Sequence, residues 1–128
     1  MRVAAASTCE SAYGPGGKII WAEADSPDTI TQYLIKTCDA TSSTTCAASK
    51  AVLATVANNV APFFSVGGET LAWTDPVAGA IYACQISACT PTLIAAGQSL
   101  VLPAPFTNSL RHNVVTDGPN LYWTTNDG

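Results

Sequence analysis

Five cysteines are the residues of this chain whose types and spacing most directly suggest chemistry. Four of them form close pairs, Cys38 with Cys46 and Cys84 with Cys89. Four cysteines are also a zinc ligand set, but zinc pairs are typically spaced C-x2-C, and these pairs lie in separate repeats of the sequence. We therefore favour two structural disulfides over a zinc site. Cys9 has no partner in this pattern, so it either pairs outside the chain or is buried.

Glu23, Asp25 and Asp28 form the only local cluster of acids. Because alternate residues of a strand point to one side, Glu23 and Asp25 have the geometry for a calcium site or an acid/base pair. The sequence offers no further oxygen ligands and no partner residue there, so we expect no site. Three other acids border turns, where carboxylates usually accept backbone N–H groups, and we expect them to cap these turns: Asp75, Asp117 and Asp127.

The candidate ligand-binding residues lie near the only histidine, His112. It stands between Arg111 and Asn113, directly before an expected strand, and Phe106 lies in the preceding segment 97–110. This segment is an insertion relative to the preceding blade junction, and long loops on a rigid scaffold often carry recognition. The alternative is a solvated loop end. The serines form no Ser-His-Asp order and no phosphate-binding glycine loop is present, so we expect no catalytic residues and no cofactor.

The composition excludes several classes of protein. Of 128 residues only 11% are charged, the net charge is -4 and no cluster of Lys and Arg exists, which excludes a nucleic-acid footprint. The longest apolar runs contain proline and are too short for membrane insertion. The cysteine pairs favour an oxidising compartment, so we expect a secreted, periplasmic or cell-surface protein. The start, MRVAAASTCE, is too short in its apolar part for a signal peptide, and we expect the export signal to lie upstream.

Short runs of β-branched and aromatic residues between turn residues predict an all-β fold. Almost no window has the spacing of an amphipathic helix. Turns are expected at GPGG (14–17), GG (67–68), DPVAG (75–79) and DGPN (117–120). A weak first strand is expected around Ser11 to Tyr13, and the clearer strands are expected at 18–24, 30–37, 51–56, 61–66, 70–74, 80–86, 92–96, 113–117 and 120–125.

Three segments align on their tryptophans: GGKIIWAEAD, GETLAWTDPV and GPNLYWTTND. Trp21, Trp73 and Trp123 lie 52 and 50 positions apart. After the first two, the same features return in the same order: a strand with an aromatic residue, two cysteines and a short apolar run. Each repeat therefore holds four short antiparallel strands in about 45–52 residues, which is the period of a propeller blade. We expect the tryptophans to pack between blades rather than to stack on sugars.

The residues LAWTD (71–75) and LYWTT (121–125) resemble the second blade strand of YWTD and NHL-like β-propellers, and FSVGG and VVTDG resemble the first. The pair Cys84 and Cys89 resembles that of disulfide-containing secreted bacterial propeller proteins, in which a disulfide joins the third and fourth strands. The resemblance implies a propeller fold and a binding function. IIWAE and LYWTT depart from the four-residue YWTD motif of the family. The contacts between blades that depend on the aspartate of this motif are therefore not expected at these two positions.

About two and a half blades of four antiparallel strands fit within the chain. We expect residues 1–7 to form the last strand of a preceding blade, 8–58 and 59–97 to form blades, and 98–128 to form an insertion and the first half of a third blade. Closed propellers have about four to eight blades, so this ring is incomplete. Either the residues are a piece of a longer chain, or further copies close the ring, with residues 1–7 of one copy completing the last blade of another.

We expect a non-catalytic, secreted or surface propeller module that binds a protein or another ligand. The alternative is part of a propeller enzyme, or a carbohydrate-binding propeller, with its site at the mouth of the central channel, where His112 and Asp117 would act. The expected partner is a protein or further copies of the chain, with a glycan as another candidate. Neither nucleic acid nor membrane insertion is expected.

Overall fold

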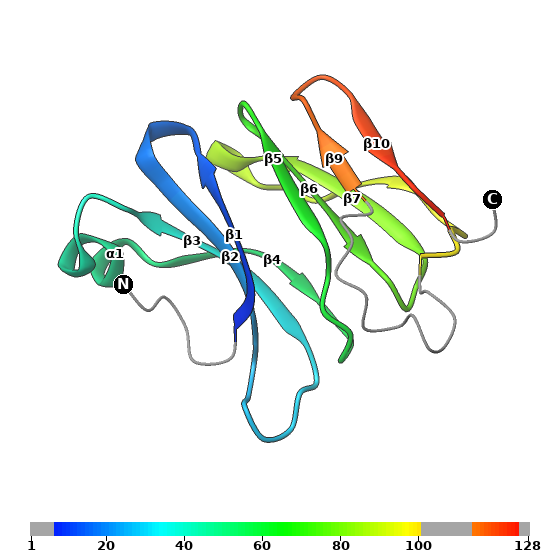
Figure 1. The fold of residues 1–128 in the computed structure, drawn as a ribbon, viewed down its shortest axis with the longest axis horizontal. Helices are drawn as coiled ribbons and strands as arrows, with labels where there is room; N and C mark the ends of the chain where they lie inside the picture. Colours follow the sequence, from blue (N-terminus) through cyan, green and yellow to red (C-terminus); the bar gives the residue numbers. More distant parts are fainter. Residues whose placement is uncertain (1–6, 101–113, 126–128) are drawn as a thin grey trace. The chain divides into compact units, whose positions relative to one another are not determined.

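The computed structural model describes residues 7–100 and 114–125, with side chains from residue 11 onward except that of Ser43. The chain forms two compact units, Met1–Ala61 and Pro62–Gly128. Both units are built mainly from antiparallel strands (Figure 1), so the expected β class is confirmed.

The first unit contains one four-stranded sheet, sheet A, in which neighbouring strands are also neighbours in the sequence. A 3-10 turn, η1 (Pro15–Gly17), joins its first two strands, and helix α1 (Ser43–Ser49) lies between its last two. The strands of sheet A are β1 (Ser7–Gly14), β2 (Lys18–Ala24), β3 (Tyr33–Asp39) and β4 (Ala51–Val56).

The second unit contains a four-stranded sheet with the same order, sheet B, and a two-stranded sheet, sheet C. A 3-10 turn, η2 (Ile86–Ala88), follows the third strand of sheet B. The strands of sheet B are β5 (Phe64–Gly67), β6 (Thr70–Asp75), β7 (Ala80–Gln85) and β8 (Thr92–Ala95), and those of sheet C are β9 (Val114–Thr116) and β10 (Leu121–Trp123).

The strands lie where the sequence predicts them, with small shifts at their ends. β2 and β4 begin and end at the predicted residues. β3 begins at Tyr33 rather than at residue 30. The reason is that Asp25 accepts hydrogen bonds from the backbone N–H groups of Thr31 and Gln32, which holds both residues in the loop. Of the strand predicted at 1–7, residues 1–6 lie outside the described residues, and Ser7 begins β1.

Helix α1 was not predicted, because its sequence, STTCAAS, has no apolar stripe. Its first turn is capped by Ser42, whose hydroxyl accepts a hydrogen bond from the backbone N–H of Thr45 at 3.0 Å. Its Cys46 is joined by a disulfide to Cys38 of β3. The prediction of a chain without helices is therefore wrong for this segment, where a cap and a covalent anchor take the place of a packed apolar face.

Sheets A and B have the same register around their tryptophans. Trp21 and Trp73 each lie on the second strand of their sheet. In both sheets the cysteine of the third strand stands opposite the residue two positions before the tryptophan: Cys38 opposite Ile19, and Cys84 opposite Leu71. The two disulfides therefore begin at equivalent places.

Sheets A and B also share one irregularity between their third and fourth strands. In each, a β-bulge leaves one residue of the fourth strand unpaired, Leu53 in β4 and Ile94 in β8. The bulges follow equivalent third-strand residues, Ile35 and Ile81. The tryptophan, the third-strand cysteine and the bulge therefore occupy equivalent positions in sheets A and B, which makes the two sheets copies of one structural repeat.

Sheet C has the register of the first two strands of this repeat. Trp123 stands opposite Val114 of the first strand, as Trp73 stands opposite Phe64 and Trp21 opposite Ser11. We call the face of each sheet that carries this tryptophan the Trp face, and the other the opposite face.

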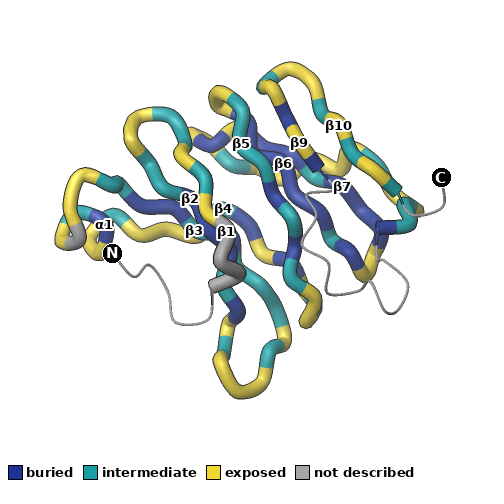
Figure 2. Tube along the Cα trace, in the orientation of Figure 1, coloured by how far each residue is buried: buried dark blue, intermediate teal, exposed yellow. Residues whose placement is uncertain are grey.

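In the second unit, the Trp face of sheet C packs on the opposite face of sheet B. Val114 is 1% exposed and shares a buried cluster with residues of β6 and β7, and the partly buried Leu121 and Trp123 pack against this cluster. Figure 2 shows β6 and β7 as largely buried strands. The buried partners from sheet B are Ala72, Ile81 and Ala83.

Hydrogen bonds and a close approach of backbones fix this packing at the hairpin ends. The backbone N–H of Thr116 donates to Ser65 Oγ at 3.1 Å, and Thr70 Oγ1 donates to the carbonyl of Gly118 at 3.0 Å. A Cβ atom on Gly67 would lie 2.7 Å from the backbone nitrogen of Gly118. The glycine is therefore needed because another backbone occupies the space of a side chain.

Replacing this glycine tests the packing of sheet C on sheet B. Gly67→Ala is expected to lower the free energy of unfolding by about 1–3 kcal/mol, since the backbone of sheet C must move. The control is Gly14→Ala at the equivalent position of sheet A, where the nearest atom to the new Cβ is the side-chain Cδ1 of Ile20 at 3.1 Å. Urea unfolding followed by tryptophan fluorescence measures both, and equal losses would contradict this packing.

Candidate functional site

The residues proposed from the sequence to bind a ligand lie outside the described residues. They are Phe106, Arg111, His112 and Asn113, and they remain predictions. The same holds for the role of Asp127 and for the side chain of Cys9. The candidate sites that the structure describes are the disulfide-anchored helix, the acids of sheet A and the opposite face of sheet C.

Both expected disulfides are present. Cys38 is bonded to Cys46 and Cys84 to Cys89, with Cα atoms 4.8 Å and 5.0 Å apart. All four sulfur atoms are therefore engaged, which rules out the zinc alternative. Two intramolecular disulfides also indicate that the chain folds in an oxidising environment. No helix among the described residues is long and apolar enough to cross a membrane.

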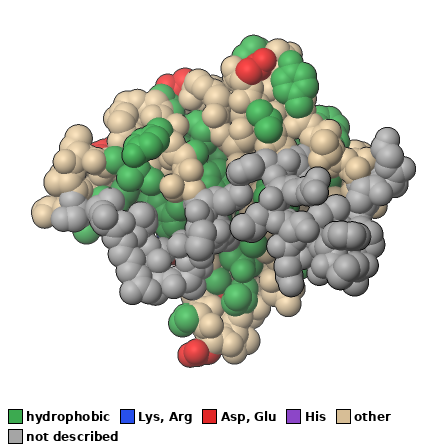
Figure 3. Space-filling model, in the orientation of Figure 1, with side chains coloured by type: hydrophobic (Ala, Val, Ile, Leu, Met, Phe, Trp, Pro, Cys, Tyr) green, Lys and Arg blue, Asp and Glu red, His purple; other side chains and the backbone are tan. Residues whose placement is uncertain are grey.

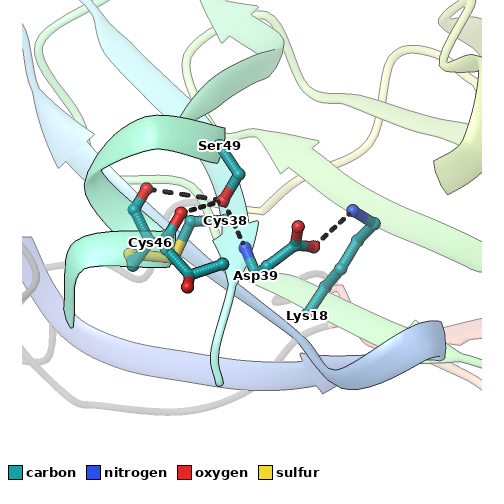
Figure 4. Close-up of polar contacts among 6 residues, drawn as sticks. Lys18, Cys38, Asp39, Cys46 and Ser49 are labelled. Atoms are coloured by element: carbon teal, nitrogen blue, oxygen red, sulfur yellow. Dashed lines mark hydrogen bonds and ion pairs between the residues drawn. A yellow bond between two sulfur atoms is a disulfide. The ribbon is translucent and has the colours of Figure 1, made fainter. Parts of the chain in front are cut away.

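The Cys38–Cys46 disulfide lies beside a small polar network at the end of β3 (Figure 4). Ser49 Oγ donates to the carbonyl oxygen of Thr45 at 2.6 Å and accepts from the backbone N–H of Asp39 at 2.8 Å. The carboxylate of Asp39 forms an ion pair with Lys18 Nζ at 3.0 Å. The network ties α1 back to β3, and the half-exposed Lys18–Asp39 pair is its outer part.

The tryptophans of sheets A and B are packing residues. Trp21 is 1% exposed and packs against the Cys38–Cys46 disulfide, and Lys50 Nζ lies 5.9 Å from its ring centre. Trp73 is 2% exposed and stacks on Tyr82 with 5.7 Å between ring centres. Both rings are buried against residues of their own sheets rather than exposed to a sugar, and packing between blades stays a prediction.

The acids of sheet A have partners of their own. Glu23 forms an ion pair with Lys36 on the neighbouring strand and accepts a hydrogen bond from Trp21 Nε1 at 3.3 Å. Asp25 closes the loop between β2 and β3, where its Oδ2 accepts from Thr31 Oγ1 at 2.5 Å. Within the described ranges, no group of three or more His, Cys, Asp and Glu side chains is placed to hold a metal ion.

Two of the turn-bordering acids cap their turns as expected. Asp75 Oδ1 accepts from the backbone N–H of Ala78 at 3.0 Å, and Asp117 Oδ1 accepts from that of Asn120 at 2.9 Å. The carboxylate of Asp117 is thus used within the β9–β10 turn.

The opposite face of sheet C is an exposed apolar surface that the sequence analysis did not predict. Val115 and Tyr122 stand opposite each other on this face and are 51% and 59% exposed. Figure 3 shows hydrophobic side chains exposed on the drawn side of the molecule, with a few acidic side chains at its rim. The signal was present in the sequence: Tyr122 of the third repeat stands where the first two have Ile20 and Ala72.

Comparison with protein-family models, with curated proteins and with solved structures finds no match to this chain.

The loop closed by Asp25 is expected to respond to acid. Hydrogen bonds from the hydroxyl and backbone N–H of Thr31 hold the pKa of Asp25 below its usual value of 3.8. Because the folded-state pKa is the lower one, the carboxylate's contribution to loop stability is complete above pH 3.8 and is lost as the pH falls through the folded-state pKa. Thr31→Val should raise the Asp25 pKa, and Thr29→Val, in the same loop, should leave it unchanged. Carboxyl-carbon NMR titration measures both, and an unmoved pKa in Thr31→Val would refute this origin of the shift.

The two disulfides are expected to stabilise their units by unequal amounts. They close loops with sequence separations of 8 and 5 residues, and the chain-entropy model gives about 2–3 kcal/mol for such loops. Replacing Cys84 and Cys89 together by Ser should lower the free energy of unfolding by this amount. Replacing Cys38 and Cys46 should lower it further and reduce the helical circular dichroism signal, because both sulfurs pack on Trp21. Equal losses with unchanged helicity would show that α1 does not need its anchor.

Proposed function

We propose that this chain is part of a β-propeller of the YWTD or NHL-like kind and serves as a non-catalytic, secreted or surface module for binding. The observation that carries the proposal is the common register of sheets A and B, with their tryptophans, cysteines and bulges at equivalent positions. A propeller blade is a four-stranded antiparallel sheet, and both sheets have their four strands in chain order.

The packing of sheet C on sheet B supports the proposal. Successive blades of a propeller lie face to face around an axis. In the second unit, the first two strands of one repeat pack on the opposite face of the repeat before it, through Val114 and Ala72. Both faces of β6 are covered as well, since Thr70, Leu71, Ala72, Trp73 and Thr74 are all buried.

The polar groups of the described residues support binding over catalysis. Lys36 neutralises Glu23, and Asp25 and Asp75 hold loops. The alternative function places an enzyme or carbohydrate site at the mouth of a central channel, with Asp117 assisting His112. Asp117 instead accepts two hydrogen bonds from Asn120, at 2.9 Å and 3.3 Å. We therefore favour a scaffold whose partner is a protein or a further copy of the chain.

Electron microscopy of the native protein tests the architecture. We expect a closed ring of four-stranded sheets arranged radially around a channel. A sandwich or an open stack of sheets would refute the propeller.

Thermal unfolding separates a scaffold from a metal-dependent or sugar-binding propeller. We expect the same melting temperature in millimolar calcium as in a chelator, because no group of three or more acids among the described residues is placed to hold a metal ion. We also expect no retention on a glycan array. A large upward shift with calcium, or a reproducible glycan signal, would favour the alternative at the channel mouth. Asp25→Asn serves as the control, since it changes the acid content of sheet A without touching segment 106–113.

A further inference from the structure

The connections that follow the third strands of sheets A and B begin at equivalent cysteines but are anchored differently. In sheet B, the turn η2 has an anchor besides its disulfide. Its Ile86 is 5% exposed, and the backbone N–H of this residue donates to the carbonyl oxygen of Glu69 at 2.8 Å. Among the described side chains of α1, by contrast, only that of Cys46 is buried. The disulfide to Cys38 is therefore the buried attachment of α1 in the part of the chain that the structure describes.

The other attachments of α1 are polar and lie near water. Ser49 Oγ accepts from the backbone N–H of Asp39 at 2.8 Å, and Ser42 Oγ accepts from that of Thr45 at 3.0 Å. Water can replace such hydrogen bonds, so each of them adds little net stability. Helix α1 has seven residues, whereas isolated helices shorter than about 12–15 residues are marginal in water. Without its disulfide, α1 is therefore expected to unfold.

The disulfide of sheet A also covers a tryptophan. Trp21 shares one buried cluster with Cys38 and Cys46. The equivalent Trp73 of sheet B stacks on Tyr82 of its own sheet instead. Opening the disulfide of sheet A thus changes the surroundings of a tryptophan, whereas opening that of sheet B leaves the aromatic stack in place.

We propose that the Cys38–Cys46 disulfide is a redox switch for α1. In the oxidised state α1 is closed on Trp21 and lies beside the Lys18–Asp39 ion pair as one fixed surface. In the reduced state α1 unfolds, and Trp21 loses this cover. The inference concerns sheet A alone, so it goes beyond the proposed propeller function and does not depend on it.

The reductant is a dithiol, of which the protein dithiol–disulfide oxidoreductases are the biological class. A thiolate of the dithiol attacks Cys46 Sγ and forms a mixed disulfide, while the bond between the two cysteines breaks and Cys38 leaves as a thiolate that takes up a proton. The second thiol of the reductant then attacks the mixed disulfide and releases Cys46 as a thiol. In total, two electrons and two protons pass to the protein, and the dithiol becomes a disulfide.

Burial sets the order in which the two disulfides react. Cys89 is partly exposed, so a thiolate reaches its sulfur in the folded protein. Cys38 and Cys46 are 0% and 5% exposed, so attack there has to wait until α1 opens locally. Because the rate of thiol–disulfide exchange depends on access to the sulfur, Cys84–Cys89 is reduced first. The first reduction leaves the fold unchanged, and the second one operates the switch.

Staged reduction of the complete chain with dithiothreitol tests the proposal. Alkylation and mass spectrometry map the thiols at each time, and NMR follows the indole N–H signals and the amide exchange. We expect the Trp21 indole signal to move in step with reduction of Cys38–Cys46. The Cys46 amide, which donates to the Ser42 carbonyl at 2.9 Å, should exchange about tenfold faster or more. The Ile86 amide of sheet B should keep its protection, and reoxidation should reverse both changes.

Two matched variants keep one disulfide each, with Cys9→Ser in both so that no third thiol takes part in exchange. The variant with Cys84→Ser and Cys89→Ser should respond to dithiothreitol as the wild type does. The variant with Cys38→Ser and Cys46→Ser should have an open α1 from the start and should show no further change. If this second variant does not fold, the wild-type time course decides alone.

Four results would overturn the inference. The first is an unmoved Trp21 signal and unchanged Cys46 exchange after mass spectrometry has shown the disulfide of sheet A to be reduced. The second is a response that follows reduction of the disulfide of sheet B. The third is loss of amide protection throughout both sheets, since this would show a disulfide that holds the whole fold rather than α1. The last is a disulfide of sheet A that dithiothreitol reduces only in denaturant. None of these results bears on the ring sought by electron microscopy, so the propeller proposal stands or fails separately.

Discussion

Burial of β6, the second strand of sheet B, on both of its faces is the constraint on which the rest of the second unit depends. In β6, five consecutive residues, Thr70 to Thr74, are buried, although side chains of a strand alternate between two faces. Such burial requires packed side chains on each side of the strand. The side chains on the two faces of β6 differ in size. Leu71 and Trp73 fill the Trp face, whereas the small Ala72 on the opposite face lets sheet C approach. Polar atoms in these layers are paired, as Thr74 Oγ1 is with the backbone N–H of Phe63.

The disulfides act within the sheets rather than between the layers. Each joins the end of a third strand to the connection that follows it, so it shortens the unpaired part of that connection. The two connections differ although their anchors are equivalent. Sheet B uses the short turn η2, whereas sheet A uses helix α1, whose Cys46 packs on Trp21. Trp73 has Tyr82 beside it instead, at the position where Trp21 faces Lys36. In sheet A the disulfide that anchors α1 therefore covers Trp21, as Tyr82 covers Trp73 in sheet B.

The sequence predicted the features that depend on local pattern. The strands follow from β-branched and aromatic runs, and the turns at Gly16, Gly68 and Gly118 from residues that tolerate positive φ. The pairing of cysteines followed from their spacing. Helix α1 was missed because a cap and a disulfide stabilise it, and neither gives an apolar periodicity. The exposed face of sheet C was missed for another reason: the sequence shows that Tyr122 replaces Ile20 and Ala72 of the other repeats, but only the structure shows that Tyr122 is exposed.

A repeat that covers both faces of its sheets leaves little free surface for chemistry inside the series. This is consistent with the 11% share of charged residues. Most of the described carboxylates serve loops, turns and two ion pairs rather than a cluster. Specific recognition must then arise where the repeat is interrupted. In the described residues such a place is α1 with its Lys18–Asp39 pair. In this proposal, the repeat supplies the scaffold and the segments that interrupt it supply recognition.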